Sequence, residues 1–308
     1  MRRQVGRVVA AVAVVGAMVS GCGSGPSQIG SAAIVGSDVI PLGTVQNQIA
    51  IALSPGKAQA VAGRNQGAGG GYGPPQVARE IVTSAILGDL LDRRTAEEGI
   101  AISDADLDAA LATAGSPDEL AQASLYTPDV QREKIRDDLA AAALGARYVD
   151  RLGVTLEFVA LPTEEEATGA ARAVAAGGPG ADAVFADAPP EQRAQQVRAV
   201  DNPALATSFA FGTPAGSVIV LRPAQDGAPW TVIRILERTT DLAPEGPSAL
   251  DRFGQSDLQL IGYRLLQPAS EELGVQVNPR FGVWDPIQLA VVDADQTAGT
   301  IVRAPAVP

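Results

Sequence analysis

The chain has 308 residues, a formal net charge of −12, no histidine and a single cysteine. The absence of histidine excludes Ser-His-Asp and Cys-His catalytic sites, and one cysteine cannot form an intramolecular disulfide. Because the chain is acidic, we expect it to be repelled by nucleic acid. We also expect no metal and no cofactor, since the commonest metal ligand is missing.

The first residues have the pattern of an export signal. Three arginines within the first seven residues precede an apolar run over 8–19, which is short for a membrane span of about 20 residues. The next motif, Val19-Ser20-Gly21-Cys22, resembles a bacterial lipobox, in which the cysteine carries the lipid. This resemblance predicts a lipoprotein signal peptide over 1–21, lipidation of Cys22 and a tether over 22–30. An ordinary secretory signal with an incidental cysteine is the alternative.

Apolar residues at helical spacing dominate the region from 31 to 150. A short apolar segment that turns at Gly36 comes first. After it we expect helices over 41–53, 77–99 and from 127 to about 150. Between the first two helices, eight of the thirteen residues over 63–75 are Gly or Pro, which predicts a flexible loop.

Two short motifs in this region invite a chemical interpretation that the neighbouring residues do not support. The Asp-x-Asp-x-Asp run over 104–108 would need Gly and Glu at the sixth and twelfth positions of an EF-hand loop, where the chain has Ala109 and Gly115. We therefore expect Ser103 to cap a helix with acids in its first turn. Ser54-Pro55-Gly56-Lys57 matches the S-x-x-K motif of penicillin-recognising enzymes, but no K-T-G motif accompanies it.

A strand followed by a capped helix is predicted in the middle of the chain. Residues 154–160 alternate apolar and other side chains, and Pro162 ends the run. Thr163 can then cap a helix, with Glu166 reaching back to the cap's own amide. Three glutamates in the first turn suit the positive end of the helix dipole.

This strand and helix resemble the opening of a parvulin-type prolyl isomerase domain, whose first strand reads R-H-I-L-V and whose helix begins E-E-E-A. Pro229 to Ile235 resembles the closing strand G-W-H-I-I-K-V, and Ala204 to Val220 resembles the stretch between them. The two parvulin histidines fall at Phe158 and Thr231. The resemblance therefore implies a degenerate parvulin-like domain over 151–240 that is not an isomerase. A weakly active isomerase that uses other residues is the alternative.

The C-terminal region is predicted to contain a last long helix over 250–273, which Pro268 kinks or ends early. The alternating residues over 274–284 predict a strand. Residues 293–308 are expected to form a tail. Because neither this helix nor the N-terminal helices look able to bury an apolar stripe alone, we expect them to pack together.

The whole arrangement resembles foldases of the SurA and PrsA type. The residues that carry the resemblance are the start A-A-I-V-G before a helix, the junction Gly99 to Asp104, and a helical region that leads into the parvulin-like module. The ending V-N-P-R-F-G-x-W also resembles that of SurA-domain lipoproteins from high-GC Gram-positive bacteria. The implied fold class is α+β: a discontinuous helical chaperone domain over 31–150 and 246–292, with an inserted parvulin-like α/β module.

The favoured functional hypothesis is a chaperone held on the extracytoplasmic face of the cell membrane by its N-terminal lipid. Its partners would be unfolded or partly folded exported proteins, and it would not be an enzyme. The alternative is a cell-envelope scaffold lipoprotein that binds one folded partner. The candidate peptide-binding residues are the aromatics Phe158, Phe209, Phe211 and Trp230, although core packing explains each of them as well.

Overall fold

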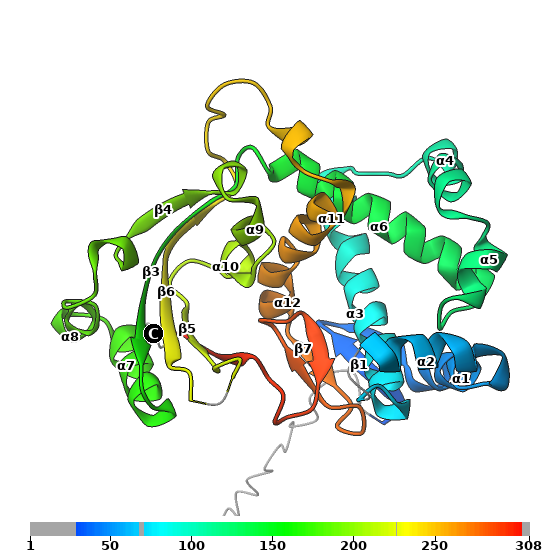
Figure 1. The fold of residues 1–308 in the computed structure, drawn as a ribbon, viewed down its shortest axis with the longest axis horizontal. Coiled ribbons are helices and arrows are strands. Elements are labelled where there is room, and N and C mark those ends of the chain that lie inside the picture. The colour runs from blue at the N-terminus through cyan, green and yellow to red at the C-terminus, as the bar shows by residue number, and fades with distance from the viewer. Residues whose placement is uncertain (1–28, 68–70, 226, 304–308) are drawn as a thin grey trace, which may run out of the picture.

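The computed structural model in Figure 1 describes residues 29–67, 71–225 and 227–303, and it mixes helices with antiparallel sheets. The expected α+β class is therefore confirmed. The predicted signal peptide, the predicted lipidation site Cys22 and most of the predicted tether lie outside the described residues. Within the described ranges, no helix is both long enough and apolar enough to cross a membrane.

The N-terminal region is a strand hairpin followed by helices. Strands β1 and β2 come first, and helices α1 to α6 follow, with a short 3-10 turn before α2. Their bounds are β1 Ser31–Val35, β2 Asp38–Pro41, α1 Leu42–Ala52, α2 Ala58–Gly67, α3 Pro74–Glu98, α4 Asp104–Ala114, α5 Pro117–Gln122 and α6 Pro128–Tyr148. The loop predicted over 63–75 is wrong at its start, because residues 63–67 continue α2. Glycine inside a helix costs only about 1 kcal/mol, so composition alone does not fix the boundary.

The helix ends follow the predicted capping chemistry. Gly99 ends α3 with a φ of 63°, a left-handed conformation that glycine adopts without strain. The Ser103 hydroxyl accepts a hydrogen bond from the Asp106 amide at 3.1 Å. Asp104 and Asp108 pair with arginines of α6 at 3.2 and 3.0 Å, and the described residues contain no acidic group arranged to hold a metal ion. The cap interpretation of residues 103–108 is confirmed.

Segments from the two ends of the chain form one helical unit. Strand β7 (Val275–Val277) pairs antiparallel with β1, and helix α11 (Gln255–Arg264) packs along α6. The predicted long helix is broken at Leu265, and α12 (Gln267–Leu273) begins next to Pro268. The break occurs where a proline removes a backbone donor, as expected.

The middle of the chain forms most of a five-stranded antiparallel sheet with the order β10-β5-β6-β3-β4. Helices α7 and α8 lie on its outer side in Figure 1, and α9 and α10 lie between the sheet and the helical unit. The bounds are β3 Gly153–Leu161, α7 Glu164–Ala176, α8 Pro179–Val184, β4 Gln195–Arg198, α9 Pro203–Ala206, α10 Phe209–Gly212, β5 Val218–Leu221 and β6 Trp230–Thr239.

Thr163 caps α7 as predicted, accepting a hydrogen bond from the Glu166 amide at 3.2 Å. The Glu166 carboxylate accepts from the Thr163 hydroxyl at 2.9 Å, rather than from the amide of Thr163 as expected. The helix still begins at the predicted residue, and three carboxylates occupy its first turn.

Residues 293–308 are not simply a tail, which corrects the prediction. Residues Gly299–Val302 form β10, which pairs with β5 at the outer edge of the five-stranded sheet. The preceding residues form a hairpin of β8 (Val283–Asp285) and β9 (Ala290–Val292). The strand predicted over 274–284 is therefore two strands, β7 and β8, separated by a turn at Pro279.

The sheet has two differently covered faces. On the outer face, Val218, Val220 and Val232 pack against α7. On the inner face, Ile219 and Ile235 join a core that also contains Leu90 of α3 and Leu265. This core is continuous with that of the helical unit, so the inner face is largely packed.

Candidate functional site

The two positions that match the parvulin histidines lie close together on the inner face of the sheet. Thr231 pairs with Ala160 and Phe158 pairs with Ile233. Because paired residues and residues two apart share one face of a sheet, Phe158 and Thr231 are diagonal neighbours. Both are half-buried, and Phe158 packs against the main core.

The four candidate aromatics do not form one peptide-binding surface. Phe211 is fully buried, with 0% exposure, so it is removed from the candidate surface. Trp230 packs with Val159 and α7 on the outer face, opposite Phe158. Phe209 is half-buried against the main core. Contacts with the two hydrophobic cores account for the positions of these four side chains.

A second surface, which the sequence did not indicate, lies where β7, β8 and β10 meet. A cavity of about 820 Å³ opens there. We call it the edge groove. It is lined mainly by apolar residues of the three strands and their connections: Gly274, Val275, Val277, Pro279, Gly282, Val283, Trp284, Pro286, Ala294 and Ile301, with the polar residues Ser270, Glu271, Asp293 and Arg303.

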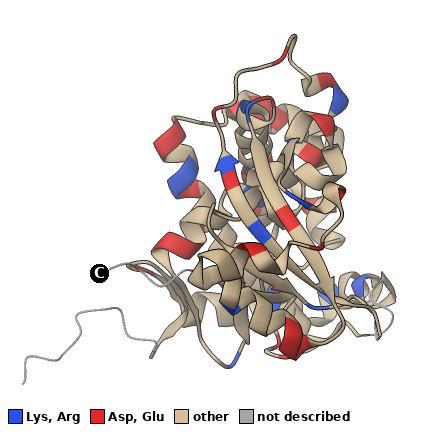
Figure 2. Ribbon diagram, turned by 90° about the vertical axis from the view of Figure 1, so that its left-hand side faces the viewer, with Lys and Arg blue, Asp and Glu red and all other residues tan. Residues whose placement is uncertain are grey.

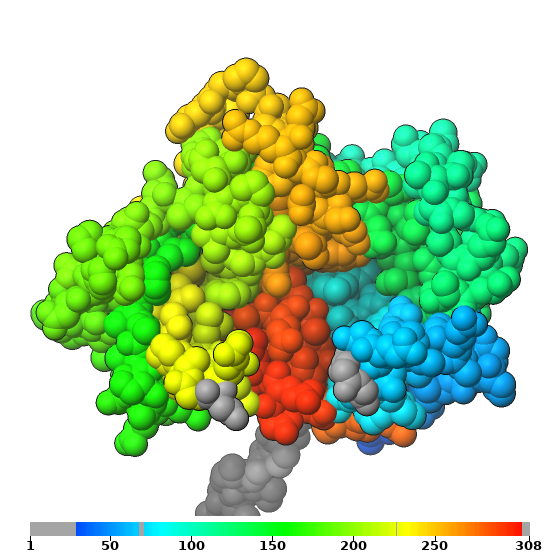
Figure 3. All heavy atoms as spheres, in the orientation of Figure 1, coloured from blue at the N-terminus to red at the C-terminus, as the bar shows by residue number. Residues whose placement is uncertain are grey.

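The strands around the edge groove end their sheets. Among the described residues, β7 is the last strand of the sheet β2-β1-β7, β10 is the last strand of the five-stranded sheet, and β8 pairs with β9. A terminal strand presents backbone groups that can pair with another extended chain. Figure 3 shows the C-terminal segment, coloured red, between the sheet on one side and the helical unit on the other. The edge groove therefore combines apolar side chains with strand edges.

Asp285 holds the connections around the groove. It is 1% exposed, and its carboxylate accepts hydrogen bonds from the Ile287 amide at 2.8 Å and the Ala298 amide at 2.6 Å. It also accepts from the amide and side chain of Gln288, at 3.2 and 2.8 Å. One buried carboxylate thus fixes both the turn after β8 and the entry to β10. The sequence carried no local signal for this role, because Ala298 is thirteen residues away.

Helix α3 supports the groove from behind. Arg79 donates from its Nε to the Phe281 carbonyl at 3.1 Å and pairs with Asp293. The Thr83 hydroxyl accepts from the Val291 amide at 2.8 Å. These contacts mount the β8–β9 hairpin on a long helix, so the apolar surface rests on a rigid element.

The polar groups at the groove are partly engaged with one another. Glu271 of α12 pairs with Arg303, which follows β10. The Trp284 indole nitrogen is buried and has no hydrogen-bond partner among the described residues. A buried indole N–H normally finds an acceptor, so this donor is unsatisfied in the structure.

Other polar groups are structural. Lys57, the lysine of the S-x-x-K motif, donates to the carbonyl oxygens of Tyr126, at 2.5 Å, and Ala121. It therefore joins the turn before α2 to the start of α6. Arg234 and Glu157 form a cross-strand ion pair at 2.7 Å, and Figure 2 shows basic and acidic positions side by side on the strands.

The comparisons with known proteins give distant similarities. No protein-family model matches the chain, and no curated protein matches it. Among solved structures, the chain is similar to the foldase protein PrsA from Lactococcus lactis, with 12% identity, a TM-score of 0.27, and coverage of 81% of this chain and 95% of that one. It is also similar to PrsA from Streptococcus pneumoniae, with 12% identity, a TM-score of 0.24, and coverage of 79% and 94%.

Proposed function

We propose that the protein is a lipid-anchored chaperone that binds extended segments of unfolded exported proteins in the edge groove, without prolyl isomerase catalysis. The observation that carries the proposal is the meeting of terminal strands β8 and β10 at an apolar groove of about 820 Å³. An extended peptide can add to a terminal strand through backbone hydrogen bonds, while apolar pockets take its alternate side chains.

Sequence-tolerant binding follows from this mode of recognition. The backbone groups of a peptide are the same whatever its sequence, and Val283, Trp284 and Ile301 offer apolar contact without a dedicated charged pocket. A scaffold for one folded partner would instead require a surface that discriminates among partners.

The inner face of the sheet lacks the polar groups that isomerase catalysis would need at Phe158 and Thr231. Rotation about an ordinary amide bond meets a barrier of about 18–20 kcal/mol, and catalysis requires polar groups placed around the twisting bond. Phe158 offers an apolar ring and Thr231 one hydroxyl, and the inner face is packed against the main core. We therefore expect Xaa-Pro peptides to isomerise at the uncatalysed rate in the presence of the protein.

The test is suppression of aggregation for three unrelated, chemically denatured client proteins. Val283→Lys places a charge in the groove, where Val283 is 38% exposed. The matched control is Val39→Lys on β2, where the valine is 44% exposed and lies at the end of the sheet β2-β1-β7 away from the groove. We expect the wild-type protein and the control to suppress aggregation of all three clients, and Val283→Lys to lose most of the effect. Activity toward one client alone would favour the scaffold, and equal activity of both variants would place binding elsewhere.

A further inference from the structure

A second, smaller cavity lies where α3, the end of β6 and α12 meet. Its volume is about 330 Å³. Arg93, Arg94 and Arg238 line it, with Glu97 and Glu272 as its acidic residues and Leu90, Leu265 and Leu273 among its apolar ones. We call it the arginine cavity. It does not share lining residues with the edge groove.

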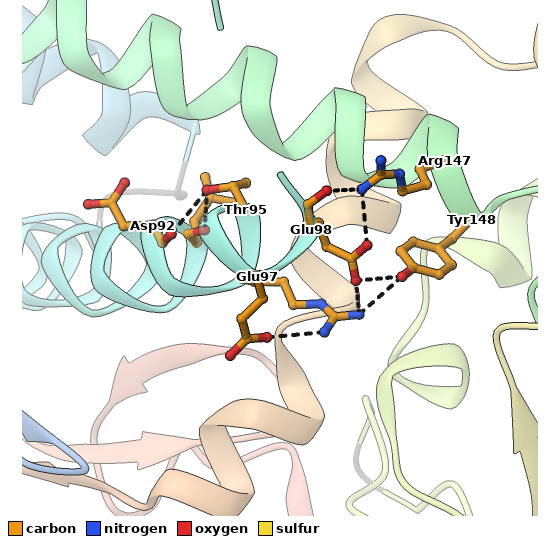
Figure 4. A network of polar contacts seen from close by, with 8 residues as sticks. Asp92, Thr95, Glu97, Glu98, Arg147 and Tyr148 are labelled. Atoms are coloured by element: carbon orange, nitrogen blue, oxygen red, sulfur yellow. Dashed lines mark hydrogen bonds and ion pairs between the residues drawn. The ribbon is translucent and has the colours of Figure 1, made fainter. Parts of the chain in front are cut away.

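Two of the three arginines are matched by acidic partners. Arg93 pairs with Asp89 at 2.9 Å and also with Asp38. Arg94 pairs with Glu97 at 3.2 Å and with Glu98 at 2.6 Å. Figure 4 shows the network around Glu98, whose carboxylate also accepts hydrogen bonds from Arg147 and from the Tyr148 hydroxyl.

Arg238 has no such partner. Its side chain is on the inner face of the sheet beside Val154, and its Nε donates to the Phe211 carbonyl at 2.6 Å. Among the described residues, no carboxylate lies within 4.0 Å of its guanidinium. Burial, and then the nearby charge of Arg94, lower the pKa of Arg238 to about 10. Arg238 is half-buried, and a partly desolvated cation without a counterion is unfavourable, which favours an anionic ligand.

We propose that the arginine cavity binds a carboxylate carried on a short aliphatic body. The guanidinium plane matches a carboxylate, with two parallel N–H donors for its two oxygens. The leucine side chains of the cavity suit an aliphatic group attached to that carboxylate. The volume lies at the lower end of the range for small-molecule sites, so the ligand is about the size of one acylated amino acid. A polypeptide C-terminus that ends in an aliphatic residue and a free acyl amino acid share this chemistry.

The internal alternative is that Glu272 or Glu97 turns toward Arg238 and neutralises it. Glu272 is exposed and lines the same cavity, so its carboxylate can compete with an external ligand. An external carboxylate and one supplied by the chain would then compete for the same guanidinium.

The experiment is an NMR titration of the full protein with N-acetylleucine, its neutral amide, and inorganic phosphate. We expect saturable shifts at Leu90 and Leu265 with the acid, and affinity at least ~10-fold weaker for the amide and for phosphate. A peptide ending in a free leucine carboxylate, compared with the same peptide amidated, distinguishes a polypeptide terminus from a free amino acid.

Variants then test the guanidinium. Arg238→Gln should abolish binding of the acid, whereas Arg172→Gln, at an exposed arginine of α7, should leave it unchanged. Equal binding of acid and amide to the wild-type protein would overturn the proposal without any variant. Binding that appears only in Glu272→Gln would also overturn it, because the chain would then supply its own carboxylate.

Discussion

Residues 255–302 run from α11 to β10, and the two ends of this segment pack in opposite ways. At α11 the backbones of the segment and of α6 are in close contact. A Cβ added to Gly262 would lie 1.9 Å from the carbonyl oxygen of Ala141, and a Cβ added to Gly145 would lie 1.9 Å from the carbonyl oxygen of Leu258. At β8 and β10 the same segment leaves terminal strands around a cavity. One end therefore closes the core, while the other leaves the open groove at which we propose that clients bind.

The largest effect is expected from a substitution where α11 crosses α6. Gly262→Ala forces a methyl group against the backbone of α6, and we expect a loss of about 3 kcal/mol in the free energy of unfolding. Gly169→Ala on α7 is the control, because nothing lies within 4 Å of the added Cβ. It should be neutral or stabilise by up to about 1 kcal/mol. Denaturant unfolding measures both, and equal stabilities would show that the crossing is not tight.

A substitution of Asp285 tests whether this buried carboxylate holds β10 in place at the groove. Asp285→Ala leaves the Ile287 and Ala298 amides without their acceptor, and we expect a loss of about 2 kcal/mol. Hydrogen exchange should quicken at Ala298 and along β10, while α11 is unaffected. The exposed Asp295→Ala is the control. Unchanged exchange in β10 would mean that Asp285 does not hold that strand.

Asp137, on the tightly packed helix α6, should make the free energy of unfolding depend on pH. Burial, and then the charge of Asp92, raise the pKa of Asp137 to about 7. A carboxyl whose pKa is higher in the folded state binds protons more tightly there, so the free energy of unfolding falls as pH rises from about 4 to about 7. Allowing for solvent at this half-buried side chain, Asp137→Asn should add about 1 kcal/mol at pH 8 and nothing at pH 4. An identical pH profile for the two proteins, measured by urea unfolding, would contradict the role of Asp137.

The sequence predicted the features that local chemistry controls. Periodicity located α3 and α6, capping chemistry located the starts at Ser103 and Thr163, and Pro268 located the break between α11 and α12. These features depend on residues within one or two turns of each other.

Features that depend on distant residues were missed. Strand β10 is short, and its partner β5 is about eighty residues away. The edge groove exists because three such strands meet, and Arg238 stands out only when α3 and β6 are side by side. Composition did predict that aromatic residues could belong to the core, and Phe211 is an example.

The central claim is that unfolded polypeptide binds at the terminal strands of the edge groove. Hydrogen exchange of the wild-type protein, with and without a saturating, permanently unfolded client, tests it most directly. Two terminal strands away from the groove provide the control: β2, at the other end of the sheet that β7 ends, and β4, at the other end of the sheet that β10 ends. We predict that the client slows exchange in β8 and β10 and leaves β2 and β4 unchanged. Protection confined to β2 or β4, or no protection at any of these strands, would contradict the claim.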